Sequence, residues 1–199
     1  MGAVVFGTYD GFMKLWEILN GEGQCSDEAS VVVHGGAGAA AGVAQSLVWM
    51  GWEQWVAQVS HSNAYRLRTT CHHSLAFGSL FGSYQATHYF LIKTMTVMSR
   101  DAGASNEESS KLSLIASPSI LATGLAGGYA GMVHHIVHHY SSHWRRHHAT
   151  SLPPLPRVQP TIASFLPMSL CFLALEYGGE GAEEIYDRIT GLLGNPTTA

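Results

Sequence analysis

The chain has 199 residues, which is enough for one domain of ordinary size. Only 12% of its residues are charged, against roughly 25% in soluble globular domains, and its net charge of −4 speaks against nucleic acid as a partner. The three cysteines include no C-x-x-C pair, which excludes an obvious zinc knuckle or disulfide framework. We therefore expect an all-α membrane protein.

Residues 1–30 form a polar, glycine-rich and acidic segment. They lack a basic leader followed by an apolar core, so we expect no cleaved targeting peptide. Apolar residues recur here at helical spacing, namely Phe12, Leu15, Trp16 and Leu19. This spacing predicts a short amphipathic helix that lies on a membrane or on a partner. A solvated tail with a few apolar side chains is the alternative.

Four mostly uncharged segments follow, and a helix needs only about 20 residues to cross the hydrocarbon layer. The sequence predicts four transmembrane helices at about 31–52, 72–92, 119–140 and 161–177. The last is the weakest, because it is short, contains Pro167 and reaches Tyr177 only by including Glu176. The segments between them are predicted to be a linker and two polar loops. The four spans form one domain, 31–179, and the acidic residues 180–199 form a C-terminal tail or surface helix.

The charges also predict how the helices are oriented. Five arginines lie in the first and third connections, whereas thirteen of the fourteen acidic residues lie in the termini, in the second connection or at the end of the last span. The positive-inside rule then places the first and third connections inside and both termini outside.

Small residues recur four positions apart on three of the predicted helices, so that they share one helical face. Such small-xxx-small faces let membrane helices approach closely. The glycines predicted to pack helices are Gly38, Gly42, Gly78, Gly82, Gly124, Gly127, Gly128 and Gly131.

Histidines gather where the third span ends. Their spacing resembles the histidine boxes of membrane di-iron desaturases and hydroxylases, in which imidazoles bind iron. The weak metal candidates are His135, His138, His139, His143, His147 and His148. No third box follows, so we favour a helix end at the lipid headgroups. On this interpretation Arg66, Arg68, Arg145 and Arg146 contact anionic phospholipid such as cardiolipin.

The pattern of small residues resembles the mitochondrial inner-membrane translocase family, the seventeen, twenty-two and twenty-three kilodalton Tim proteins. The resemblance covers about 31–179. It is carried by Gly38 and Gly42, by Ser74, Gly78 and Gly82, by Gly124 and Gly128, and by the Leu173–Gly179 stretch. It implies a multi-pass protein of the mitochondrial inner membrane with both termini in the intermembrane space.

This family includes import-channel components and a non-catalytic accessory subunit of respiratory complex I. The acidic patches that the import members use are not evident within the predicted spans. The resemblance therefore favours the accessory-subunit branch, with no catalytic residue and no cofactor, and with other membrane subunits of a large respiratory assembly as partners. The alternatives are an import translocase, a subunit of another inner-membrane assembly such as ATP synthase, and a di-iron desaturase or hydroxylase.

Overall fold

The computed structural model describes residues 2–20, 27–101, 118–146 and 154–177, and within these ranges it contains helices and no strand. The helices are α1 (Gly2–Asn20), α2 (Asp27–Val56), α3 (Asn63–Asp101), α4 (Pro118–Arg146), α5 (Val158–Ala163) and α6 (Phe165–Tyr177). The all-α prediction is confirmed for this part of the chain.

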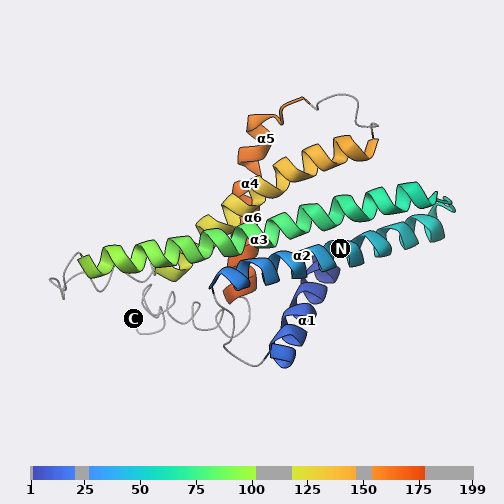
Figure 1. Cartoon of the computed structure of the whole chain (residues 1–199). Coiled ribbons are helices and arrows are strands. Elements are labelled where there is room, and N and C mark those ends of the chain that lie inside the picture. The colour runs from blue at the N-terminus through green and yellow to red at the C-terminus, as the bar shows by residue number, and fades with distance from the viewer. Residues whose placement is uncertain (1, 21–26, 102–117, 147–153, 178–199) are drawn as a thin grey trace, which may run out of the picture.

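Helix α3 is the centre of the bundle. It packs against α2 on one side and α4 on the other, while α1 packs on α2 and α6 packs on α4. Figure 1 shows α2 and α3 as a long antiparallel pair, with α1 projecting from one face and α4 to α6 gathered on the other. Much of the buried core is alanine, which keeps the helix axes close. The fully buried alanines are Ala37, Ala41, Ala76, Ala122, Ala126 and Ala130.

Within the described residues, three segments are long and apolar enough to cross a membrane: Ser30–Val56, Ser119–Trp144 and Val158–Tyr177. They contain the first, third and fourth predicted spans and support a membrane-embedded protein. The predicted span 72–92 lies in α3, which is not among the three. It carries polar side chains, some of which bond to a neighbouring helix, as in the 3.0 Å hydrogen bond from Gln85 to Ser30.

The helices are longer than the predicted spans. Helix α2 continues to Val56, and α3 runs from Asn63 to Asp101, so the predicted linker reduces to residues 57–62. The first part of the predicted polar loop after Ile92 is likewise helical. Charged residues such as Lys93 mark where a helix leaves an apolar layer, but lysine is itself a good helix former and does not end the helix.

The last membrane segment is broken between α5 and α6, at Ser164. The cause is Pro167, which has no N–H for the carbonyl of Ala163 and whose ring clashes with that carbonyl. Pro160 is tolerated because it lies in the first turn of α5, where N–H groups have no partner within the helix. The Ser164 hydroxyl donates to the Thr161 carbonyl at 2.6 Å, on the N-terminal side of the break.

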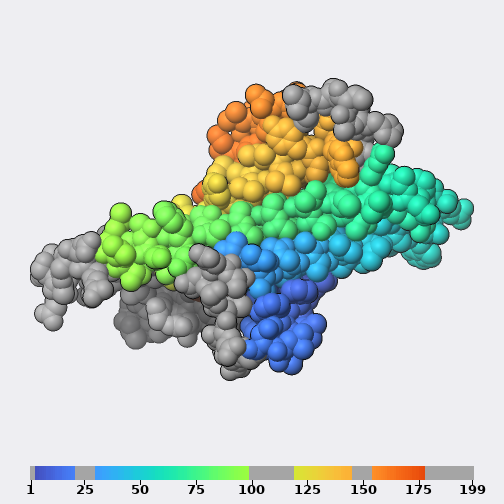
Figure 2. Space-filling view, in the orientation of Figure 1, coloured from blue at the N-terminus to red at the C-terminus, as the bar shows by residue number. Residues whose placement is uncertain are grey.

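Helix α1 is anchored by its N-terminal half. Val5 is only 3% exposed, Phe6 meets the ring of Phe81 edge-on, and Tyr9 stacks on Phe81 with 4.0 Å between ring centroids. Its C-terminal half carries exposed apolar residues, among them Ile18 at 79%. In the space-filling view α1 projects from the bundle, as does the C-terminal part of α3 (Figure 2).

Candidate functional site

Four of the predicted packing glycines lie where α2 meets α3. A Cβ atom on Gly38 would lie 2.5 Å from the carbonyl oxygen of Phe77, and a Cβ atom on Gly42 would meet the backbone of His73. On the facing helix, a Cβ atom on Gly78 would lie 3.2 Å from the carbonyl oxygen of Gly35, and Gly82 adjoins the same residue. Real Cβ atoms do not approach a carbonyl oxygen to 2.5 Å, so Gly38 and Gly42 leave no room for a side chain.

The other four predicted packing glycines, Gly124, Gly127, Gly128 and Gly131, lie on α4 and face α6. A Cβ atom on Gly128 would lie 2.5 Å from the ring of Phe165, and one on Gly131 would lie 2.6 Å from the side chain of Met168. Here glycine meets large side chains, whereas the α2–α3 contact brings backbone against backbone.

The histidines of α4 have different partners. His134 Nδ1 lies 2.9 Å from the carbonyl oxygen of Ala76, and His139 Nε2 lies 2.9 Å from that of Pro154. His138 stacks at an angle against His72, with 4.6 Å between ring centroids. Among the described residues, no three His, Cys, Asp or Glu side chains are placed to hold a metal ion. His135 and His143 are partly buried on α4, and His147 and His148 lie outside the described residues.

The histidines do contribute to a cavity of about 500 Å³ between α2, α3 and α4. Its lining residues are Gln45, Trp49, Glu53, Tyr65, His72, His73 and His138. His72 is 1% exposed and its Nδ1 lies 2.7 Å from Ser141 Oγ. This buried contact joins α3 to α4. The Gln45 side-chain oxygen is buried and accepts no hydrogen bond from the described residues.

The rim of this histidine cavity carries one further polar contact. His61 Nε2 lies 2.9 Å from Glu53 Oε2, and the contact becomes an ion pair when the imidazole is protonated. His61 also stacks on Tyr65, with 4.4 Å between ring centroids. Residues 57–62 are thereby held to both helices that they join.

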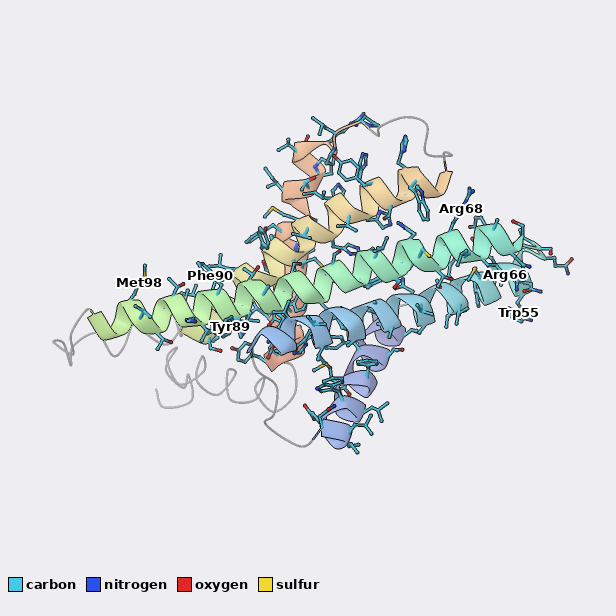
Figure 3. All side chains as sticks on the ribbon, viewed as in Figure 1. Trp55, Arg66, Arg68, Tyr89, Phe90 and Met98 are labelled. Atoms are coloured by element: carbon cyan, nitrogen blue, oxygen red, sulfur yellow. The ribbon has the colours of Figure 1, made fainter. Side chains whose placement is uncertain are left out.

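Arg66 and Arg68 lie at the same end of the bundle as this cavity. Figure 3 shows both arginines at the same end of the α2–α3 pair as Trp55, while Tyr89, Phe90 and Met98 lie toward the other end of α3. Arg145 and Arg146 end α4, but their side chains lie outside the part of the chain that is described. Cations beside tryptophan are typical of the level of lipid headgroups.

Sequence reasoning missed the polar contacts that join distant helices. His72 and Ser141 are 69 positions apart, and the hydroxyl of Tyr84 donates to Glu176 at 2.7 Å across 92 positions. No local pattern identifies such pairs. The available signal was a polar residue within an otherwise uncharged helix, since a buried polar group needs a partner. The presence of such a polar residue does not reveal which residue it bonds to.

No family model, curated protein or solved structure matches this chain. The resemblance to the inner-membrane translocase family therefore rests on the residue pattern alone. Function has to be argued from the surfaces and contacts of the chain itself.

Proposed function

We propose that this chain is a non-catalytic accessory subunit of the membrane arm of mitochondrial respiratory complex I, the NADH:ubiquinone oxidoreductase. Its four transmembrane helices and both termini would be arranged as the charges predict, with the termini in the intermembrane space. The observation that carries the proposal is a surface of large apolar side chains that extends beyond the membrane-crossing part of the bundle.

Helix α3 carries this surface. Its 39 residues span about 58 Å at 1.5 Å per residue, nearly twice the roughly 30 Å of a hydrocarbon layer. Beyond the uncharged stretch that ends at Ile92 it keeps large apolar side chains exposed: Val97 is 54% and Met98, labelled in Figure 3, is 66% exposed. Lipid tails do not reach past the headgroups, so this apolar surface calls for a protein partner.

The same helix fits a fourth span. Residues 69–92 contain no charged side chain and would extend about 36 Å as a helix. As the central helix, α3 can carry glutamine and histidine, because neighbouring helices bond to them. Thr123 of α4, for example, lies 3.3 Å from His88 Nε2. Close packing at the glycines would hold the four spans together without a polar core of their own.

A structural role also suits the histidines and arginines. His134 and His139 lie at hydrogen-bonding distance from backbone carbonyls, which favours a packing role over metal binding. Arg66 and Arg68, at the same end of the bundle as Trp55, would contact the phosphates of an anionic phospholipid such as cardiolipin (Figure 3). No step of chemistry is assigned to any residue.

The test is a native gel of gently solubilised mitochondrial membranes from the source organism. The bands are stained for NADH dehydrogenase activity and the chain is located by mass spectrometry. We expect it in the megadalton NADH-active band. Its presence only in a smaller, inactive band would overturn the proposal and favour the import translocase. Stoichiometric iron in that smaller band would favour the di-iron enzyme instead.

A further inference from the structure

A second cavity lies between α1 and α6, at a distance from the histidines. Within the described residues these two helices make no backbone contact with each other, and a groove of about 510 Å³ separates them, with α3 as its floor. The residues that line this groove include five aromatic side chains and one carboxylate: Phe6, Tyr9, Phe81, Tyr84, Phe172 and Glu176.

The groove lies level with the ends of the membrane segments. Glu176 is the penultimate residue of the segment that ends at Tyr177. The Tyr177 hydroxyl lies 2.8 Å from the hydroxyl of Ser119, where the segment Ser119–Trp144 begins. Gln85, one residue after Tyr84, bonds to Ser30, where the first segment begins. These contacts place Glu176 at the boundary between hydrocarbon and headgroups, with Phe81 and Phe172 deeper.

The polar atoms of the groove leave one carboxylate oxygen available. The Tyr84 hydroxyl donates to Glu176 Oε1 at 2.7 Å, and Glu176 Oε2 accepts no hydrogen bond from the described residues. Asp10, the other acid of the groove, is already paired with Lys14 at 2.8 Å. Burial raises the pKa of the Tyr9 hydroxyl, and Glu176 and Asp10 act in the same direction. That hydroxyl therefore stays protonated and can donate to His34 Nδ1.

Aromatic faces beside a carboxylate select a cation. Stacked pairs line the groove, Tyr9 on Phe81 and Tyr84 on Phe172, each with 4.0 Å between centroids. Aromatic rings attract ammonium groups through their quadrupole, and quaternary ammonium ligands are recognised in such surroundings. An anion would be repelled by Glu176. A purely apolar ligand would bury the Oε2 atom of Glu176 without a hydrogen-bond partner.

We propose that this groove binds the ammonium headgroup of a zwitterionic phospholipid, phosphatidylcholine or phosphatidylethanolamine. Its acyl chains would follow α6 toward the bilayer centre, where Leu170 is 58% and Leu166 65% exposed. Choline and ethanolamine both present a positively charged nitrogen to Glu176. The site does not depend on which assembly contains the chain.

The test is native mass spectrometry of the full-length chain, purified in maltoside micelles and stripped of lipid. Phosphatidylcholine, phosphatidylethanolamine and phosphatidylglycerol with identical acyl chains are titrated separately. We expect the two zwitterionic lipids to bind more tightly than phosphatidylglycerol. Glu176→Gln keeps an oxygen for Tyr84 to donate to but removes the charge, and should weaken phosphatidylcholine binding about tenfold. Glu53→Gln, at the opposite end of the bundle, is the matched control and should leave the binding of phosphatidylcholine unchanged.

A second variant tests the same site in case Glu176→Gln does not fold. Tyr84→Phe keeps the ring, removes the hydrogen bond that orients Glu176, and should weaken binding by a smaller factor. Competition with glycerophosphocholine separates the sources of the headgroup. Displacement by it shows that the headgroup suffices, and retention shows that the acyl chains contribute as well; both accord with the proposal.

Three results would overturn it. Equal binding of phosphatidylglycerol and phosphatidylcholine would remove the selectivity for an ammonium group. Unchanged phosphatidylcholine binding in a folded Glu176→Gln variant would remove the role of the carboxylate. A carbodiimide cross-link from Glu176 to a lysine of a neighbouring protein in native membranes would make the occupant a peptide side chain.

Discussion

The carbonyl oxygen of Phe77 occupies the space where Gly38 would carry a side chain: a Cβ atom there would lie only 2.5 Å from it. We predict that Gly38→Ala forces α2 and α3 apart and lowers the free energy of unfolding by about 1–3 kcal/mol, as overpacking does. Gly36, two residues away, has nothing within 4 Å of its would-be Cβ atom. Gly36→Ala is therefore the matched control and should be neutral or stabilising by up to about 1 kcal/mol. Thermal unfolding in detergent would compare them, and equal stability would contradict the contact.

Met98 lies near the C-terminal end of α3. Ser62 lies at the other end, in the connection just before α3 begins. If α3 crosses the membrane, the two lie on opposite sides. We predict that, after the native cysteines are replaced by serine, Met98→Cys reacts with an impermeant maleimide in mitoplasts. Ser62→Cys should react only after detergent is added. Labelling of both without detergent would show that α3 does not cross.

The buried contact between His72 and Ser141 joins α3 to α4. We predict that Ser141→Ala lowers the free energy of unfolding by about 1–3 kcal/mol, because a buried imidazole loses a hydrogen-bond partner. Ser83 offers a control, since its hydroxyl donates at 3.1 Å to the Leu80 carbonyl of its own helix. Ser83→Ala should change the midpoint of thermal unfolding much less. The contact does not stabilise the bundle if the two variants unfold at the same temperature.

The exposed end of α3 is the predicted partner surface. We expect Val97→Ser combined with Met98→Ser to release the subunit from the large assembly on a native gel, because each buried apolar side chain contributes about 1.5–3 kcal/mol. The thermal stability of the isolated subunit should stay the same. Val59→Ser, at the other end of the bundle and 44% exposed in the wild type, should assemble normally. Normal assembly of the double variant would show that the partner surface lies elsewhere.

Helix content followed from the sequence because uncharged stretches dominate it. The stretch Ser119–Tyr140, for instance, makes up most of α4. The ends of helices did not follow, because a charged residue such as Lys93 is itself a good helix former and does not end a helix. Nor did the residues through which α1 packs on the bundle, which are Val5, Phe6 and Tyr9. Leu15 and Leu19 of the predicted amphipathic face are 53% and 72% exposed.

Candidate sites were predictable only in part, for a physical reason. The glycines could be found because a missing side chain matters wherever two helices approach. The groove at Glu176 could not, because its aromatic rings come from α1, α3 and α6 and meet only in the folded bundle. In the sequence, Tyr9 is one residue of a polar segment, and only the fold brings Phe81 against its ring.

The short connection of residues 57–62 has a consequence for how the protein is made. It joins the two helices whose backbones come closest, at Gly38 and Gly42, so these contacts form between neighbouring parts of the chain. Gln58 there has a φ of 52°, the left-handed turn that commonly ends a helix and reverses the chain. Local contacts form fastest. The α2–α3 hairpin can thus assemble as soon as it leaves the insertion machinery, and it provides the surface on which α1 and α4 dock, while α6 packs on α4.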